Sequence, residues 1–215
     1  MSKISEQAIP FFGTRRIDGL NDGVFAIVMT LLVLEFNVPH LAEGEVLFEA
    51  LLLQWPTFFG YVVTFINLGV FWIGQSSQYH FLERSDRIVL WMNVLFLLFV
   101  SLLPFTTAII SHYPMETLSH LLYGANLMAV TFVGLIHWTY ATHHHRLTNH
   151  LVTKHIARAM RNRMLTLFPV CMVAMITAYF APLASLAIYL ILPVYFMLPR
   201  KSDIFWKHPA IPHTH

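Results

Sequence analysis

The chain has 215 residues, of which 57% are hydrophobic and 11% are charged. Soluble globular proteins carry about 25% charged residues, so this composition has too little charge to keep the surface of a soluble domain in water. It also excludes a disordered chain, and the single cysteine, Cys171, excludes a disulfide-stabilised scaffold. The sequence therefore predicts an all-α protein surrounded mainly by lipid.

Apolar segments long enough to cross a bilayer recur along the chain. A helix needs about 20 apolar residues to cross the hydrocarbon core, and four segments reach this length without any Asp, Glu, Lys or Arg. The first apolar segment differs because two acids, Asp22 and Glu35, stand at its ends. The last segment is shorter and follows Pro182, so the final pair is either a tight transmembrane hairpin or a re-entrant pair. We predict one transmembrane domain, 1–215, with six helices at about 16–37, 50–76, 87–110, 119–142, 163–181 and 183–199.

The charges of the loops test this count of six helices. With six spans both termini share one side, and all 13 Lys and Arg residues fall on that side. The opposite loops hold no cation, and their acids are Glu43, Glu45, Glu49 and Glu116. By the positive-inside rule, both termini are expected in the cytoplasm. The basic linker 143–162 is expected to be a surface helix near lipid headgroups or a simple connection.

The thirteen histidines raise the question of a metal or haem site. The triplet at 143–145 cannot converge on one ion, because neighbouring helical residues point about 100° apart. Only His137 lies within a predicted span, while others such as His120 lie at helix ends or in loops. No nucleophile-elbow, zinc-protease or phosphate-loop motif occurs. We therefore expect no enzyme activity, cofactor, resident metal or nucleic-acid partner.

Small and aliphatic residues form a stripe along one side of the first helix. Spacings of four, seven, eight and eleven residues place them on one face. We name this set the first-helix stripe: Gly23, Ile27, Thr30, Leu31 and Leu34. Several copies around an axis would turn the stripe into a narrow hydrophobic pore with an acidic residue at each mouth. The alternative is ordinary helix packing, with the Thr30 hydroxyl bonded to the Ala26 carbonyl.

Asp22 is a functional candidate because an acid within a membrane span is costly and needs a partner. Arg16 precedes it by six residues and points about 120° away on a helix, so it pairs elsewhere or with Asp22 of another subunit. Arg15 lies on the same face as Asp22 but about 10 Å below it. A local partner at the helix end is the other possibility.

The segment from Arg16 to Asp22, RIDGLND, carries a family resemblance. It is similar to the RxxxFSD signature that opens the first helix of the transmembrane protein 175 family of potassium channels, particularly the single-repeat prokaryotic members. The resemblance covers most of 15–142 and the remainder more loosely. Its other anchors are Trp55-Pro56, Tyr61, Phe71-Trp72, Asp86-Arg87, Trp91, Asn93, Ser101, Pro104-Phe105, Thr107 and Tyr123.

The resemblance implies a homotetramer in a prokaryotic plasma membrane, with the first helices lining a pore that prefers K⁺ to Na⁺ and lacks a carbonyl filter. Carried over by position, the hydrophobic constriction is Ile27, with Leu31 and Leu34 continuing it outward. Thr30 would form a hydroxyl layer that helps to select K⁺. The implied polar network comprises Arg16, Asn21 and Asp22, and K⁺ and the bilayer are the implied partners.

The sequence departs from the family pattern at two places. Leu20-Asn21 replaces Phe-Ser of the signature, and Gly74-Gln75-Ser76 follows Trp72 where relatives often carry Asn-His-His. We expect these changes to affect gating and the polar network rather than the fold. An amide at Asn21 can still donate and accept hydrogen bonds as a serine would.

Two other functions remain open at the level of sequence. A proton- or ion-coupled secondary transporter would use Asp22 as its protonation site, but would more naturally show inverted repeats with broken helices. A membrane scaffold would need no polar network at Asp22.

Overall fold

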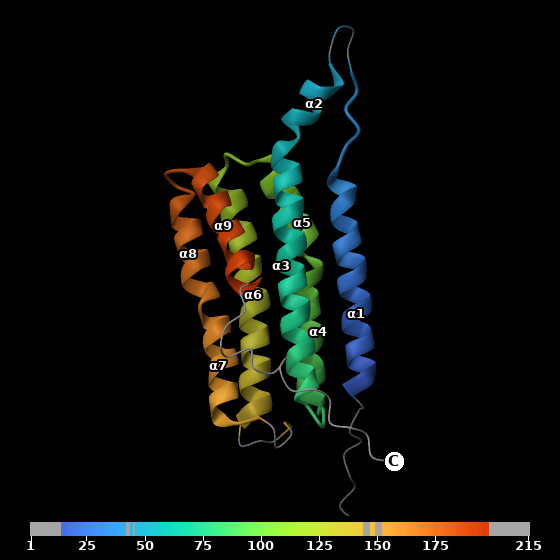
Figure 1. Ribbon diagram of the computed structural model, residues 1–215, viewed down its shortest axis with the longest axis vertical. Coiled ribbons are helices and arrows are strands. Elements are labelled where there is room, and N and C mark those ends of the chain that lie inside the picture. The colour runs from blue at the N-terminus through green and yellow to red at the C-terminus, as the bar shows by residue number, and fades with distance from the viewer. Residues whose placement is uncertain (1–13, 42–43, 45, 144–146, 149–151, 198–215) are drawn as a thin grey trace, which may run out of the picture.

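The structure is a computed structural model that describes residues 14–41, 44, 46–143, 147–148 and 152–197. Within these residues the fold is all-α, a bundle of helices that run up and down along one long axis (Figure 1). Five segments are long and apolar enough to cross a membrane, and a sixth helical segment is apolar but shorter. The five are Arg16–Glu35, Trp55–His80, Arg87–His112, Thr117–Thr142 and Lys154–Thr177, and the shorter one is Pro182–Phe196.

The first two spans are joined by a segment that projects beyond the rest of the bundle. Helix α1 (Thr14–Leu31) tightens into the 3-10 turn η1 (Leu32–Glu35), and the short α2 (Leu47–Leu53) precedes α3 (Trp55–His80). Pro56 lies in the first turn of α3, where its missing N–H is tolerated, so the chain breaks between α2 and α3. The predicted helix 50–76 therefore begins inside α2 and ends four residues before α3 does.

The third span is also divided by a proline. A single residue separates helix α4 (Arg87–Ser101) from α5 (Leu103–His112), and the first turn of α5 contains Pro104. Oriented so that both amide atoms find partners, Asn126 accepts from the Leu103 N–H at 3.3 Å and donates to the Phe99 carbonyl at 3.1 Å. One side chain thus replaces the backbone bond that the break interrupts.

A helix begins inside the basic segment 143–162, nine residues before the predicted start of the fifth helix at 163. Helix α7 (Lys154–Leu165) continues almost directly into α8 (Leu167–Thr177). The Thr153 hydroxyl caps α7 by accepting a hydrogen bond from the Ile156 N–H. The apolar side chains of α7, such as Ile156, pack near Trp138. Within the predicted linker 143–162, the part at 154–162 is therefore helical, and 144–146 and 149–151 lie outside the described residues.

Helix α6 (Thr117–Thr142) lies at the centre of the bundle. It packs against α4, α5, α7, α8 and the final helix α9 (Pro182–Met197). By contrast, α1 lies at one edge and contacts mainly α3 and α4 (Figure 1). This edge position leaves much of α1 uncovered by its own chain.

Candidate functional site: the uncovered face of the first helix

One face of α1 packs into the subunit. The residues on it recur at spacings of four, eight, eleven and fifteen, as expected for a single helical face. Each is at most 5% exposed: Ile17, Asn21, Phe25, Val28 and Leu32. Phe25, Val28 and Leu32 belong to the main hydrophobic core of the bundle. This face therefore holds α1 onto α3 and α4.

The first-helix stripe lies on the opposite face. Ile27 is 60% exposed, Leu31 42% and Leu34 71%, and Gly23 and Thr30 are exposed as well. The stripe is therefore not part of the hydrophobic core of its own subunit. Packing within the subunit does not explain why these residues share one face. The Thr30 hydroxyl donates to its own helix, to the Ile27 carbonyl at 2.8 Å rather than to Ala26.

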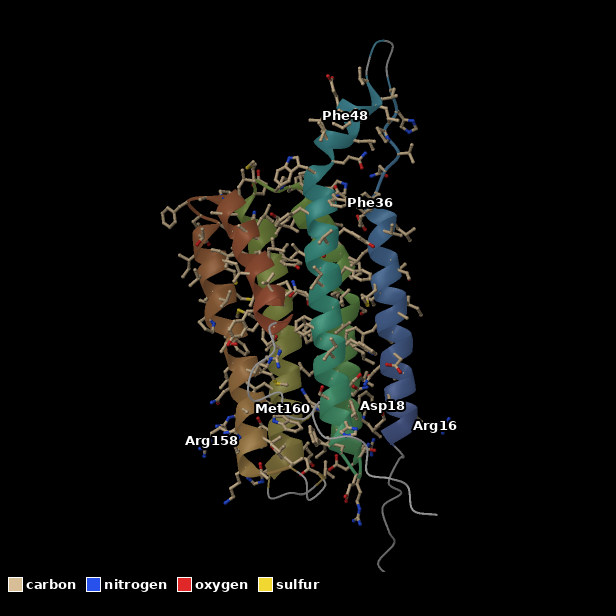
Figure 2. All side chains as sticks on the ribbon, in the orientation of Figure 1. Arg16, Asp18, Phe36, Phe48, Arg158 and Met160 are labelled. Atoms are coloured by element: carbon tan, nitrogen blue, oxygen red, sulfur yellow. The ribbon has the colours of Figure 1, made fainter. Side chains whose placement is uncertain are left out.

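Asp22 has a partner that the sequence did not indicate. Its Oδ1 accepts a hydrogen bond of 2.8 Å from the indole Nε1 of Trp72, on α3. Arg16 is exposed at the start of α1 and points away from the bundle (Figure 2). Among the described side chains, the partner of the acid is therefore a neutral donor fifty residues away in the sequence.

The adjacent residue, Asn21, enters a separate and buried polar chain. Its Oδ1 accepts from the Asn93 amide at 2.9 Å, and the Asn93 Oδ1 accepts from the Gln75 amide at 3.0 Å. All three side chains are at most 4% exposed. This chain joins α1, α4 and α3 near the end of the bundle where α1 begins, and it fixes the rotation of α1 about its own axis.

Comparisons with known proteins add to this geometry. Residues 16–104 match the model of the family described as "Endosomal/lysosomal potassium channel TMEM175". A protein of Streptomyces collinus named a potassium channel is 33% identical over 152 residues, which are 69% of this chain and 74% of that protein. The chain belongs to the TMEM175 family. The family resemblance expected from the Arg16–Asp22 region is thus confirmed.

Two further matches come from Chamaesiphon minutus. A protein named a potassium channel is 28% identical over 194 residues, covering 88% of this chain and 96% of that protein. A crystal structure described as a lysosomal potassium-selective channel TMEM175 homologue superimposes with a TM-score of 0.76 at 27% identity, over 85% of this chain and 95% of that one. The TMEM175 family is a family of channels, not enzymes, which confirms the expectation that the chain is not an enzyme.

Both departures from the family pattern meet in the buried chain. Asn21 stands where the signature has serine, and Gln75 stands where relatives often have histidine; Asn93 connects the two. The sequence predicted that the change around Gln75 would affect the polar network, but it did not place Asn93 in the site. A signal was present, since an amide inside the charge-free segment 88–110 is costly in lipid unless another polar group pairs with it.

The buried histidines have structural partners. Both ring nitrogens of His120 are bonded, to the Ser185 hydroxyl and the Pro114 carbonyl at 3.0 Å each. The His137 Nδ1 lies 2.8 Å from the Gln78 Oε1. In the part of the chain that the structure describes, no group of three His, Cys, Asp or Glu side chains could hold a metal ion.

Proposed function

We propose that four copies of this chain form a cation channel that prefers K⁺ to Na⁺, with α1 lining the pore. Each subunit would cross a prokaryotic plasma membrane six times, counting the short α9, with both termini in the cytoplasm. The names of the bacterial relatives support conduction of K⁺, and the confinement of all Lys and Arg residues to one side of the predicted topology supports the orientation.

The observation that carries the proposal is the position of the first-helix stripe on α1. The stripe lies opposite the buried face, so its aliphatic side chains must meet either lipid or other copies of the chain. Asp22 favours other copies, because it is exposed in the subunit and lies within the span Arg16–Glu35. An Asp facing lipid costs about 2.5–3.5 kcal/mol at the centre of a span, which is the upper limit for Asp22, nearer the end of its span.

The residues of the stripe suit a filterless pore. Ile27, Leu31 and Leu34 would form successive hydrophobic rings that close the pore by excluding water. The Thr30 hydroxyl donates a hydrogen bond to the Ile27 carbonyl. The lone pairs of the hydroxyl oxygen therefore remain available to a passing cation. The carbonyls of α1 are engaged in the helix and cannot replace an ion's hydration shell, so partly hydrated ions must pass.

A liposome flux assay on the purified full chain tests this proposal. Ile27→Asn replaces an aliphatic ring with amides that hold water, so we expect K⁺ flux to rise on the order of ten-fold, which corresponds to about 1.4 kcal/mol of barrier. Wild type should pass K⁺ faster than Na⁺. The matched control is Leu98→Asn on α4, since Leu98 is 52% exposed but lies on a different helix.

Three results would contradict the proposal. One is a folded tetramer of either form that passes no ion. Another is an equal rise in flux with Leu98→Asn, which would indicate general membrane leak. The third is K⁺ transport that requires a proton gradient and is abolished by Asp22→Asn, which would indicate a coupled carrier.

A further inference from the structure

A cationic groove lies between α6 and α7, at the end of the bundle where α1 begins. It has a volume of about 210 Å³ and is lined by Trp138, Thr139, Thr142, Lys154, Ala157, Arg158 and Arg161. At about 30 Å³ per water molecule, this volume would hold about seven waters, which is enough room for a phosphate group. We name it the α6–α7 groove.

The cations of the groove come from one face of α7. Lys154, Arg158 and Arg161 follow one another at spacings of four and three residues, so they form one row along the helix. All three side chains are exposed, and the described residues that line the groove include no acid. Three positive charges therefore face one small volume, which favours an anion with several oxygens.

The walls of the groove are fixed before any ligand binds. The Trp138 indole Nε1 donates to the Ala157 carbonyl at 3.1 Å, which ties α6 directly to α7. Trp138 is fully buried and packs with Phe81 and Val152, while Ile156 and Met160 of α7 pack against them. A preformed site avoids part of the ordering cost of binding.

The length of α6 places the groove at the level of lipid phosphates. Helix α6 has 26 residues, which is about 39 Å at 1.5 Å per residue, whereas the hydrocarbon core is about 30 Å thick. About 9 Å of α6 therefore lies outside the core, and the row of cations on the neighbouring α7 favours the end with Thr139 and Thr142 as the part in the headgroup layer. Arg158 lies at the same end of the molecule as Arg16, the end where the positive-inside rule predicts the cytoplasm (Figure 2).

An apolar track leads from the groove toward the middle of the membrane. Phe132 and Ile136 precede Thr139 on the same face of α6, at spacings of seven and three residues. They are 53% and 39% exposed, so the surface above the groove can carry an acyl chain. A free phosphate ester would use only the cations, whereas a phospholipid would use both the cations and the track.

We propose that the α6–α7 groove binds the phosphate of an anionic phospholipid from the cytoplasmic leaflet. Lys154, Arg158 and Arg161 contact the phosphate oxygens, and the acyl chain lies along Phe132 and Ile136. Basic pockets between membrane helices on the cytoplasmic side bind anionic headgroups by the same physics. The proposal does not depend on ion conduction, and its test does not measure flux.

Native mass spectrometry of the purified full chain tests this, with dioleoyl phosphatidylglycerol as the probe and dioleoyl phosphatidylcholine for comparison. We expect one preferred phosphatidylglycerol per subunit. A cation near the membrane surface contributes about a five-fold change in affinity. Arg158→Gln with Arg161→Gln should therefore weaken binding about 25-fold, and Arg158→Lys with Arg161→Lys should keep most of it, because lysine still binds phosphate as a point charge.

Two more variants separate this site from general attraction to charge. Thr139→Phe fills the mouth of the groove without changing any charge, so it should weaken binding about five-fold or more. Arg87→Gln removes an exposed cation at the same end of the bundle but outside the groove, and should change binding less than two-fold.

Three outcomes overturn the proposal. Equal binding of the two lipids, or a loss with Arg87→Gln as large as with Arg158→Gln, would mean that no specific site exists. Displacement of phosphatidylglycerol by millimolar glycerol 3-phosphate would mean that the groove takes a soluble phosphate ester instead. Unchanged thermal melting of each variant without lipid serves as the check on folding.

Discussion

A substitution of Thr30 can test the proposed selectivity of the pore with little effect on the stability of the subunit. The Thr30 hydroxyl is bonded only locally, to the Ile27 carbonyl, and the side chain is exposed. Thr30→Val keeps the shape and removes the oxygen, so the free energy of unfolding should change by less than about 0.5 kcal/mol. If the hydroxyl layer discriminates between ions, the K⁺/Na⁺ permeability ratio should fall on the order of two- to ten-fold, the worth of one hydrogen bond.

The measurement for Thr30 is the reversal potential in bilayers with K⁺ and Na⁺ on opposite sides. Thr30→Ser keeps the hydroxyl and should retain the ratio of wild type. An unchanged ratio in Thr30→Val would remove Thr30 from the selectivity mechanism and leave the aliphatic rings as the candidates.

The sequence could predict which residues of α1 share a face, but not which residues they meet. The four-, seven- and eleven-residue spacings defined the first-helix stripe, and the exposed fractions of its side chains agree with one shared face. The Trp72 partner of Asp22 was not predictable, because the two residues are fifty positions apart and meet only when α3 packs against α1. Tertiary contacts of this kind have no local signal.

At the scale of helices, Asn93 of α4 forms a buried hydrogen-bonded connection between α1 and α3. Asn93→Leu removes the donor of the Asn21 oxygen and the acceptor of the Gln75 amide, and both groups stay buried. The free energy of unfolding should fall by about 1–3 kcal/mol. For a chain of this size, that corresponds to a fall in melting temperature of about 2–12 °C, measured in detergent.

A triple variant provides the control for Asn93. Asn21→Leu, Gln75→Leu and Asn93→Leu together remove all three polar groups, and replacing every partner with an apolar group can be nearly neutral. We therefore expect the triple variant to be more stable than Asn93→Leu alone. A triple variant less stable than the single one would show that each amide makes a separate contribution.

The close contact of α6 with α8 and α9 depends on Gly124. A Cβ at this position would collide with the Tyr189 hydroxyl and lie 2.8 Å from the Met175 Cγ. Gly124→Ala should therefore lower the free energy of unfolding by about 1–3 kcal/mol. Gly69→Ala on α3 is the control, since nothing lies within 4 Å of its Cβ, and it should be neutral or stabilising by up to about 1 kcal/mol in thermal unfolding. Equal melting of both variants would contradict close packing at Gly124.

Helix boundaries were harder to predict than helix positions. The break between α4 and α5 falls inside a continuous apolar segment, and Asn126 of another helix satisfies the interrupted backbone. The start of α7 lies in a polar and basic segment, where the sequence left open either a surface helix or a simple connection. Its packing on Trp138 stabilises it there, and that contact depends on the tertiary structure.

For the whole molecule, the property to test is the number of subunits and the position of α1 among them. The exposed side of α1 includes Ile27, Leu34 and Asp22, and a central position of α1 in an oligomer would shelter the acid and the stripe. Light scattering of the purified protein should give the mass of four 24.8 kDa chains. A monomer would contradict the pore, since one α1 encloses no channel.

Cross-linking can test the central position of α1 directly. Neighbouring helices pack about 8–10 Å apart, so Leu34→Cys residues around an axis come within reach of a short bismaleimide, whereas peripheral ones are separated by whole subunits. The native Cys171 is fully buried, so wild type gives the background. We expect Leu34→Cys to yield mostly dimers on a denaturing gel, because one reactive thiol per chain joins only two chains. Leu98→Cys, exposed on α4, should stay monomeric, and the reverse pattern would put α1 at the periphery and α4 at the interface.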